Sequence, residues 1–282
     1  MGNKCFKSKN TNARKVNIRR LLFDKGELDK YKVLNYINKG AYGKVYDVKN
    51  QINGQNYVLK EIKKFMSFKN EYNYFKLNIK HKNLIVYNEL ISLDNKKFYI
   101  IMNKYDFDLF DLLNKSNNLT EDKVKNYIHQ ILLGLKELEN YDFYHLDIKL
   151  ENILIDKKSN NLVISDFGCM HNIESDYYCK NVTNSIGTKM YNAPEISCFG
   201  LFCRNTDVWS IGLLTYILLN KLKIPEDVFT EKDILNNIIY DCDMLSNDCL
   251  NFLDSTIEPN YKKRCSLDDC LDHRWINETI II

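Results

Sequence analysis

His145-Leu146-Asp147-Ile148-Lys149-Leu150-Glu151-Asn152 is the stretch that decides the fold of this chain. It follows a long amphipathic segment and brings three chemically active side chains into a short loop. Asp147 can accept or orient the proton of a hydroxyl group, and Lys149 can neutralise a phosphoryl group. Asn152 offers a neutral oxygen to a metal ion. The alternative interpretation is a charged loop that caps a helix, which the spacing disfavours.

A second segment, Ser165-Asp166-Phe167-Gly168, follows an apolar run over 161–164 that predicts a short buried strand. A carboxylate that ends a strand just before a glycine turn commonly projects toward Mg²⁺. Asp166 is therefore a candidate metal ligand. The tripeptide Asp166-Phe167-Gly168 can also occur by chance. Its position after the segment 145–152 is what makes it informative.

Upstream, the segment Ile37-Asn38-Lys39-Gly40-Ala41-Tyr42-Gly43-Lys44-Val45 lies between two predicted strands. Glycines let backbone N–H groups approach phosphate oxygens because no Cβ stands in the way. A tight hairpin with two glycines explains the same segment equally well. Lys60, at the end of the next strand, can supply a cation for phosphates, and Glu71 on the following helix can fix it. A solvated lysine and an exposed helix glutamate are the alternatives.

The pattern of apolar residues divides the chain into a sheet-rich part and a helix-rich part. Alternating apolar and polar residues predict a small sheet with one helix, its strands over 31–37, 40–48, 55–62 and 96–102 and its helix over 69–80. Thr120 is the predicted N-cap of a helix with an apolar stripe from Val124 to Leu138. The segment 207–220 is apolar almost all round, which predicts a helix at the centre of the second part.

Composition and cysteine usage indicate an ordinary globular protein, with 45% hydrophobic residues, 27% charged residues and a formal net charge of +3. The longest apolar run, 211–219, is too short to cross a bilayer. The nine cysteines have no regular spacing, so we expect free thiols in a reducing compartment, with a zinc site as the weaker alternative. Nothing in the sequence indicates an obligate oligomer.

Residues 1–28 predict a basic, poorly ordered extension, because residues 1–20 contain seven Lys and Arg and no acid. The start Met1-Gly2-Asn3-Lys4-Cys5 is similar to that of myristoylated and palmitoylated proteins, so lipidation at Gly2 and Cys5 would give peripheral membrane contact. Phe6 stands where that motif has Ser or Thr, and a disordered basic tail is the alternative. We do not expect nucleic-acid binding. We expect a cytoplasmic protein, with a membrane-associated or nuclear location as alternatives.

The order of these motifs resembles that of eukaryotic protein kinases of the Ser/Thr type over nearly all of 28–276. Each motif alone is weak, but their ordered co-occurrence is specific. The resemblance implies an α+β, bilobal fold. A small antiparallel-sheet lobe with one main helix would cover 29–102, and a larger, mainly helical lobe would cover 103–282. The further motifs are Gly187-Thr188-Lys189-Met190-Tyr191-Asn192-Ala193-Pro194-Glu195, Asp207-Val208-Trp209-Ser210-Ile211-Gly212, Arg264 and Leu271-Asp272-His273-Arg274-Trp275-Ile276.

The resemblance also implies an active enzyme that uses ATP and Mg²⁺ to phosphorylate Ser or Thr hydroxyls of protein substrates. Asp147 and Lys149 would be the catalytic residues, and Asn152 and Asp166 the metal ligands. The residues that the resemblance places around the nucleotide are Asn38, Gly40, Ala41, Gly43, Val45, Val58, Lys60, Glu71, Met102, Asn103, Tyr105 and Leu154.

Further roles follow from the same resemblance. Asp207 would accept hydrogen bonds from the backbone of the catalytic loop, and Thr188 would brace the two catalytic residues. Glu195 would pair with Arg264 inside the large lobe. Met102 would be the gatekeeper beside the adenine-binding backbone.

Two other functions compete with this interpretation. A pseudokinase that acts as a binding or scaffold module is disfavoured, because Lys60, Asp147 and Asp166 are all retained. A small-molecule kinase is disfavoured by the segment around Glu195 and its partner Arg264, which are typical of kinases with protein substrates.

Three residues depart from the family pattern. Asn38 replaces the first glycine of the phosphate loop, and Val58 replaces the alanine that is common beneath the adenine. Leu146 replaces the arginine that normally receives an activation-loop phosphate, so we predict a non-RD catalytic loop. Phosphorylation of Thr183 or Ser185 should then do little to order the activation loop.

Overall fold

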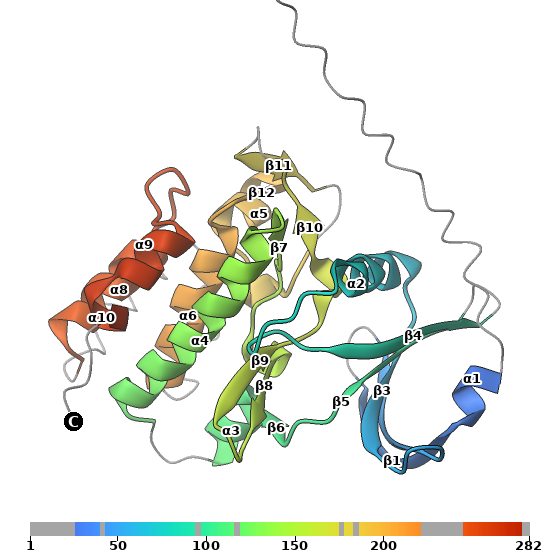
Figure 1. Ribbon diagram of the computed structural model, residues 1–282. Coiled ribbons are helices and arrows are strands. Elements are labelled where there is room, and N and C mark those ends of the chain that lie inside the picture. The colour runs from blue at the N-terminus through green and yellow to red at the C-terminus, as the bar shows by residue number, and fades with distance from the viewer. Residues whose placement is uncertain are drawn as a thin grey trace, which may run out of the picture.

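The computed structural model describes residues 26–39, 43–93, 97–115, 119–174, 178–182, 186–220 and 245–277. A short helix, α1 (Gly26–Asp29), leads into a five-stranded antiparallel sheet with strand order β1-β2-β3-β5-β4 (Figure 1). Its strands are β1 (Tyr31–Lys39), β2 (Lys44–Asn50), β3 (Asn56–Ile62), β4 (Tyr87–Leu93) and β5 (Lys97–Asn103).

The sheet buries side chains on both faces because successive residues of a strand point to opposite sides. Tyr57 and Leu59 of β3 pack with Ile101 of β5 in one hydrophobic cluster. Ile62 belongs instead to the main core, which continues into the helical part. Lys60 lies at the same parity as Ile62, so β3 directs its side chain toward the face where the rest of the chain packs.

The helix α2 (Phe65–Leu77) covers the sheet face that carries Lys60 and Ile62. It ends at a residue with a left-handed backbone conformation. Asn78, its C-cap, has φ 49°, a conformation that asparagine tolerates better than most residues. The predicted helix over 69–80 is therefore confirmed, although it begins and ends earlier than expected.

The helical part is built around α4 (Glu121–Glu139) and α6 (Thr206–Asn220), which pack against each other. Thr120 caps α4 as predicted, because its Oγ1 accepts a hydrogen bond of 3.3 Å from the Lys123 N–H. α6 is buried on all sides from Thr206 to Leu218. The remaining helices are α3 (Leu109–Lys115), α5 (Pro194–Phe199), α8 (Asn247–Thr256), α9 (Leu267–Asp272) and α10 (Arg274–Asn277).

Three small sheets lie beside these helices. β6 (Phe107–Asp108), β8 (Ile153–Asp156) and β9 (Asn161–Ile164) form one of them. The other two pair β7 (Phe143–Tyr144) with β10 (His171–Asn172), and β11 (Cys179–Asn181) with β12 (Leu201–Cys203).

The predicted α+β, bilobal fold is confirmed: a sheet with a helix is followed by a mainly helical lobe. Within the residues that the structure describes, none of the helices has the length and apolar character needed to span a membrane. The lipidation candidates Gly2 and Cys5 lie outside those residues, as do Thr183 and Ser185.

The prediction that all cysteines are free thiols is wrong for two of them. Cys179 and Cys203, which are 24 positions apart in the sequence, form a disulfide. They are direct partners across the β11–β12 pair, and neither of these short strands was predicted. The other described cysteines, which lie outside this disulfide, are Cys169, Cys198, Cys249, Cys265 and Cys270.

Candidate active site

A buried lysine joins the sheet to the helical lobe. The Nζ atom of Lys60 lies 3.0 Å from Glu71 Oε1 and 2.7 Å from Asp166 Oδ1. Glu71 is 0% exposed, so the alternative of an exposed helix glutamate is excluded. The predicted Lys60–Glu71 ion pair is confirmed, and Asp166 is a second partner of the same ammonium group.

Burial and charge act in opposite directions on these three groups. Burial disfavours a charged Lys60, but Asp166 and Glu71 outweigh it and raise the pKa of the lysine. Burial raises the pKa of Glu71 against the effect of Lys60. Burial would also raise the pKa of Asp166, but Lys60 and Lys149 together lower it below the ordinary value. Lys60 therefore stays an ammonium, and Asp166 is the more readily ionised of its two partners.

Asp166 adopts an unusual backbone conformation that aims its carboxylate at the site. It follows β9 and has φ 68°, in the left-handed region that few non-glycine residues occupy. The Phe167 N–H donates to Glu71 Oε2 at 3.1 Å, which ties the turn to α2. Strained residues of this kind persist where the surroundings hold them, commonly at functional sites.

Asp147 lies at the centre of a second set of contacts, with only 2% of its surface exposed. Lys149 Nζ donates to its Oδ2 at 2.9 Å, and Thr188 Oγ1 donates to its Oδ1 at 2.7 Å. Lys149 Nζ also donates to Thr188 Oγ1 at 2.7 Å. Asn152 Nδ2 donates to the Asp147 carbonyl at 2.7 Å and to its Oδ2 at 3.2 Å. The bracing role predicted for Thr188 is matched by these contacts.

Backbone hydrogen bonds connect the two sets of residues. The Ser165 N–H and its Oγ–H both donate to the Asn152 carbonyl, at 2.9 and 3.0 Å. His145 Nε2 lies 3.1 Å from the Ser165 carbonyl. The segments that contain Asn152 and Asp166 are therefore held side by side, and the sequence predicted these two as metal ligands.

A buried aspartate of α6 holds the backbone of the segment 145–152. Asp207 Oδ2 accepts from the His145 N–H at 2.7 Å, and its Oδ1 accepts from the Leu146 N–H at 2.8 Å, as predicted. Leu146 has φ 61°, another left-handed backbone. Gly187 packs against this turn, where an added Cβ would lie 2.4 Å from the Leu146 carbonyl oxygen, so only glycine fits.

The predicted nucleotide residues lie along one side of the sheet and the start of the helical lobe. Val45 pairs with Lys60 across β2–β3, and Val58 pairs with Met102 across β3–β5. Leu154, on β8, and Val58 both pack on the main core. The resemblance would place the adenine between Val45, Val58 and Leu154.

The other residues predicted to surround the nucleotide differ in how far they are buried. Met102 is buried, whereas Asn103 is exposed at the end of β5 and Tyr105 follows it, half-buried. Asn38 pairs with Val45 next to an irregularity in β1. A Cβ on Gly43 would meet the Glu61 carbonyl oxygen at 1.5 Å, so the hairpin approaches β3 too closely for any other residue. Gly40 and Ala41 lie outside the described residues.

Stacked aromatic rings, which sequence reasoning missed, support the Asp166 turn. The rings of Tyr74 and Phe167 stack at 3.6 Å, and His145 lies edge-on to Phe167 at 5.1 Å. Tyr87 packs against Tyr74 and donates its hydroxyl to Glu71 Oε2. The available signal was the spacing of Glu71 and Tyr74, which puts both side chains on one side of α2.

Leu146 lies in an apolar cluster. It is 3% exposed. Its partners come from several segments that are far apart in the sequence, and apolar contacts hold these segments together. The cluster consists of Tyr144, Leu146, Cys169, Ile173, Ile186, Ile196 and Phe202.

The predicted pair between Glu195 and Arg264 is confirmed deep inside the helical lobe. Arg264 Nη1 and Nη2 donate to the two carboxylate oxygens at 2.7 and 2.8 Å. Both side chains are 0% exposed. Thr206 Oγ1 also donates to Glu195 Oε1 at 2.8 Å, which connects the pair to the start of α6.

Comparison with known proteins gives the same family. The chain is 29% identical over 266 residues to a titin homolog of Caenorhabditis elegans, covering 89% of this chain and 1% of the relative. It is 30% identical over 280 residues to the serine/threonine-protein kinase SBK1 of Danio rerio, covering 90% and 71%. It is 29% identical over 201 residues to CBL-interacting protein kinase 11 of Oryza sativa subsp. japonica, covering 68% and 40%.

The chain thus spans less than half of two of these three relatives. The family model described as "Protein kinase domain" matches residues 31–276. That match includes every segment that builds the contacts above, and the chain therefore belongs to the protein kinase family.

Proposed function

We propose that this chain is an active Ser/Thr protein kinase, which transfers the γ-phosphoryl group of ATP to hydroxyl groups of protein substrates. The observation that carries the proposal is the environment of Asp147. Its carboxylate is buried, is held by Thr188 and Lys149, and lies on the same loop as Asn152. A carboxylate held this way can orient a hydroxyl and take up its proton, with a cation beside it for a phosphoryl group.

The residues present fit magnesium and a nucleotide triphosphate. Mg²⁺ binds through one or two protein oxygens together with phosphate oxygens, and the Asp166 carboxylate with the Asn152 amide oxygen supplies such a set. Bound Mg-ATP would supply the transferable phosphoryl group and neutralise its charge. Lys60 would hold phosphate oxygens while Glu71 fixes its ammonium group. The backbone at Gly43 would cover the phosphates.

The substrate class rests on two features. Lys149 follows Asp147 by two positions and contacts Thr188, a pattern that the resemblance links to Ser/Thr kinases. The Glu195–Arg264 pair holds the segment that, in this family, faces protein substrates. Similarity to proteins named as serine/threonine kinases supports the same class.

Phosphate transfer to a generic basic protein tests this proposal. We expect the purified chain with Mg-ATP to produce phosphoserine and phosphothreonine but no phosphotyrosine, and we expect chelation of Mg²⁺ to abolish the signal. The measurement is transfer of labelled phosphate followed by phosphoamino-acid analysis. A chain that binds ATP but transfers no phosphate to protein would instead be a binding module, and the proposal would be wrong.

The position of Leu146 leads to a second prediction. Leu146 is an uncharged residue buried in an apolar cluster. A phosphate on the activation loop would therefore find no arginine at position 146 to bind. We expect the double variant Thr183→Ala, Ser185→Ala to keep kcat/KM within about twofold of the wild type, since removed phosphates would cost no ion pair there. Ser197→Ala is the matched control, because it removes an exposed hydroxyl on α5. A large loss of activity in the double variant alone would contradict the prediction.

A further inference from the structure

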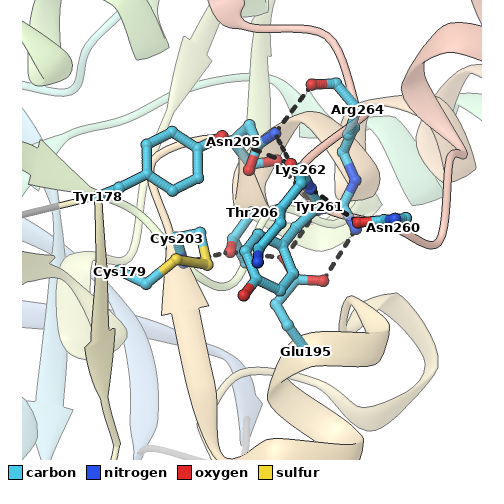
Figure 2. Close-up of a disulfide and its surroundings, with 10 residues drawn as sticks. All are labelled: Tyr178, Cys179, Glu195, Cys203, Asn205, Thr206, Asn260, Tyr261, Lys262 and Arg264. Carbon is cyan, nitrogen blue, oxygen red and sulfur yellow. Dashed lines mark hydrogen bonds and ion pairs between the residues drawn. A yellow bond between two sulfur atoms is a disulfide. The ribbon is translucent and has the colours of Figure 1, made fainter.

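The disulfide Cys179–Cys203 closes a loop that contains Thr188, one of the residues that contact Asp147. The two cysteines are opposite each other in the antiparallel pair β11–β12, with Cα atoms 4.0 Å apart (Figure 2). The backbone pairing alone therefore brings the two sulfur atoms within bonding range. The 24-residue separation encloses Gly187, Thr188 and the whole of α5.

Both ends of this loop are attached to the helical lobe. Cys203 N–H donates to Thr206 Oγ1 at 2.8 Å, and the same hydroxyl donates to Glu195 of the buried ion pair. Beside Cys179, the Tyr178 ring stacks on Tyr261, and the Tyr178 carbonyl accepts from the Arg204 N–H at 3.1 Å. The disulfide thus fastens the strand that enters the loop to the strand that is already fixed on α6.

The two cysteine residues differ in how far they are exposed to solvent. Cys203 is 0% exposed, whereas Cys179 is half-buried. Another close pair, Cys265 and Cys270, has sulfur atoms 3.3 Å apart and is not bonded. Proximity of sulfur atoms is therefore not by itself sufficient for a bond in this structure.

We propose that Cys179 and Cys203 are a reversible thiol–disulfide modification site, which stabilises the loop 179–203 when oxidised and loosens it when reduced. The reaction partner is a small disulfide such as glutathione disulfide. The Cys179 thiolate attacks it, forming a mixed disulfide and releasing one glutathione thiolate. The Cys203 thiolate then attacks the Cys179 sulfur and releases the second glutathione. In total, two protein thiols are oxidised and one glutathione disulfide is reduced to two thiols, with the two protons passing to the glutathiones.

The effect should fall on protein substrates and not on the nucleotide. The enclosed loop contains Thr188 and the start of α5, while Lys60, Asn152 and Asp166 lie outside it. This part of the inference rests on the proposed kinase activity. We expect reduction to raise KM for the protein substrate about fivefold and to leave KM for ATP within about twofold, because only the substrate-facing loop gains mobility.

Two readouts do not depend on activity. Reduction should lower Tm by about 5 °C, because the unfolded chain loses a cross-link. It should also accelerate amide hydrogen exchange over 186–203 about tenfold. The experiment equilibrates the full chain in glutathione buffers of stepped GSH to GSSG ratio and maps disulfide peptides by mass spectrometry. Exchange, Tm and kinetics are then measured on the same samples.

Two variants make the result specific. Cys179→Ser replaces the more exposed of the two cysteines, and it should behave like the reduced wild type in every buffer. Cys198→Ser removes an exposed thiol of the same loop that is not in the disulfide, and it should respond like the wild type. An inactive chain with an intact exchange response would contradict the kinase proposal and support the disulfide site. The disulfide proposal is wrong if no Cys179–Cys203 peptide forms, if reduction leaves exchange unchanged, or if Cys179→Ser still responds.

Discussion

Replacing Asp147 with asparagine is expected to lower kcat for protein phosphorylation by about 10³-fold, with KM for ATP within about threefold of the wild type. The carboxylate accepts hydrogen bonds from Lys149, Thr188 and Asn152. An amide of the same shape has one acceptor oxygen, and its NH₂ group would face a donor. The variant therefore loses both the proton acceptor and the alignment of Lys149, while the groups proposed to hold the nucleotide remain.

The control for this prediction is Asp254→Asn, on α8. Asp254 is exposed, so the same chemical change should leave kcat unchanged. Steady-state kinetics would be measured together with Tm and ATP binding for both variants, so that a folding defect is distinguished from a chemical one. An Asp147→Asn enzyme that keeps a tenth or more of the wild-type kcat would show that this carboxylate is not the proposed proton acceptor.

The contacts that were predicted before the structure was known are those of buried charged side chains, which need an opposite charge or hydrogen-bond donors. Lys60 and Glu71 are opposite charges on adjacent elements, and a buried charge needs a partner, which made this pair a candidate; Asp166 is a second partner of Lys60. The acceptor role of Asp207 was implied by the family resemblance, and two backbone N–H groups donate to this buried carboxylate. In both cases a buried charge without a partner would be costly, which is the physical reason why the contact forms.

The contacts that were missed depend on how apolar side chains meet in space. Tyr74 and Phe167 are ordinary core residues in the sequence, and only the packing of α2 on the Asp166 turn brings their rings together. Cys179 and Cys203 are 24 positions apart, and only the register of two three-residue strands makes them neighbours. Strands this short leave almost no periodic pattern. Leu146 was visible as a departure, but its apolar cluster was not.

Removing one partner of the Glu195–Arg264 pair is expected to be the largest single loss of stability outside the site. Arg264→Met should lower the free energy of unfolding by about 3–5 kcal/mol, because it leaves a buried carboxylate without its counter-charge. Thr206 would remain as a donor to Glu195, but one hydroxyl hydrogen bond does not replace two charge-assisted ones. Glu195→Gln should cost a similar amount, because Arg264 would keep its charge in a 0% exposed position.

The double variant Glu195→Gln, Arg264→Met distinguishes charge from packing. It removes both charges while nearly keeping both volumes, so it should be more stable than the sum of the single losses predicts, by about 2 kcal/mol or more. Urea unfolding of the four proteins measures the coupling. Strict additivity would mean that the lost contacts of Arg264 with the Glu258 and Asn205 carbonyls and its position over the Trp209 ring account for the effect. The ion pair would then not be what stabilises this part of the lobe.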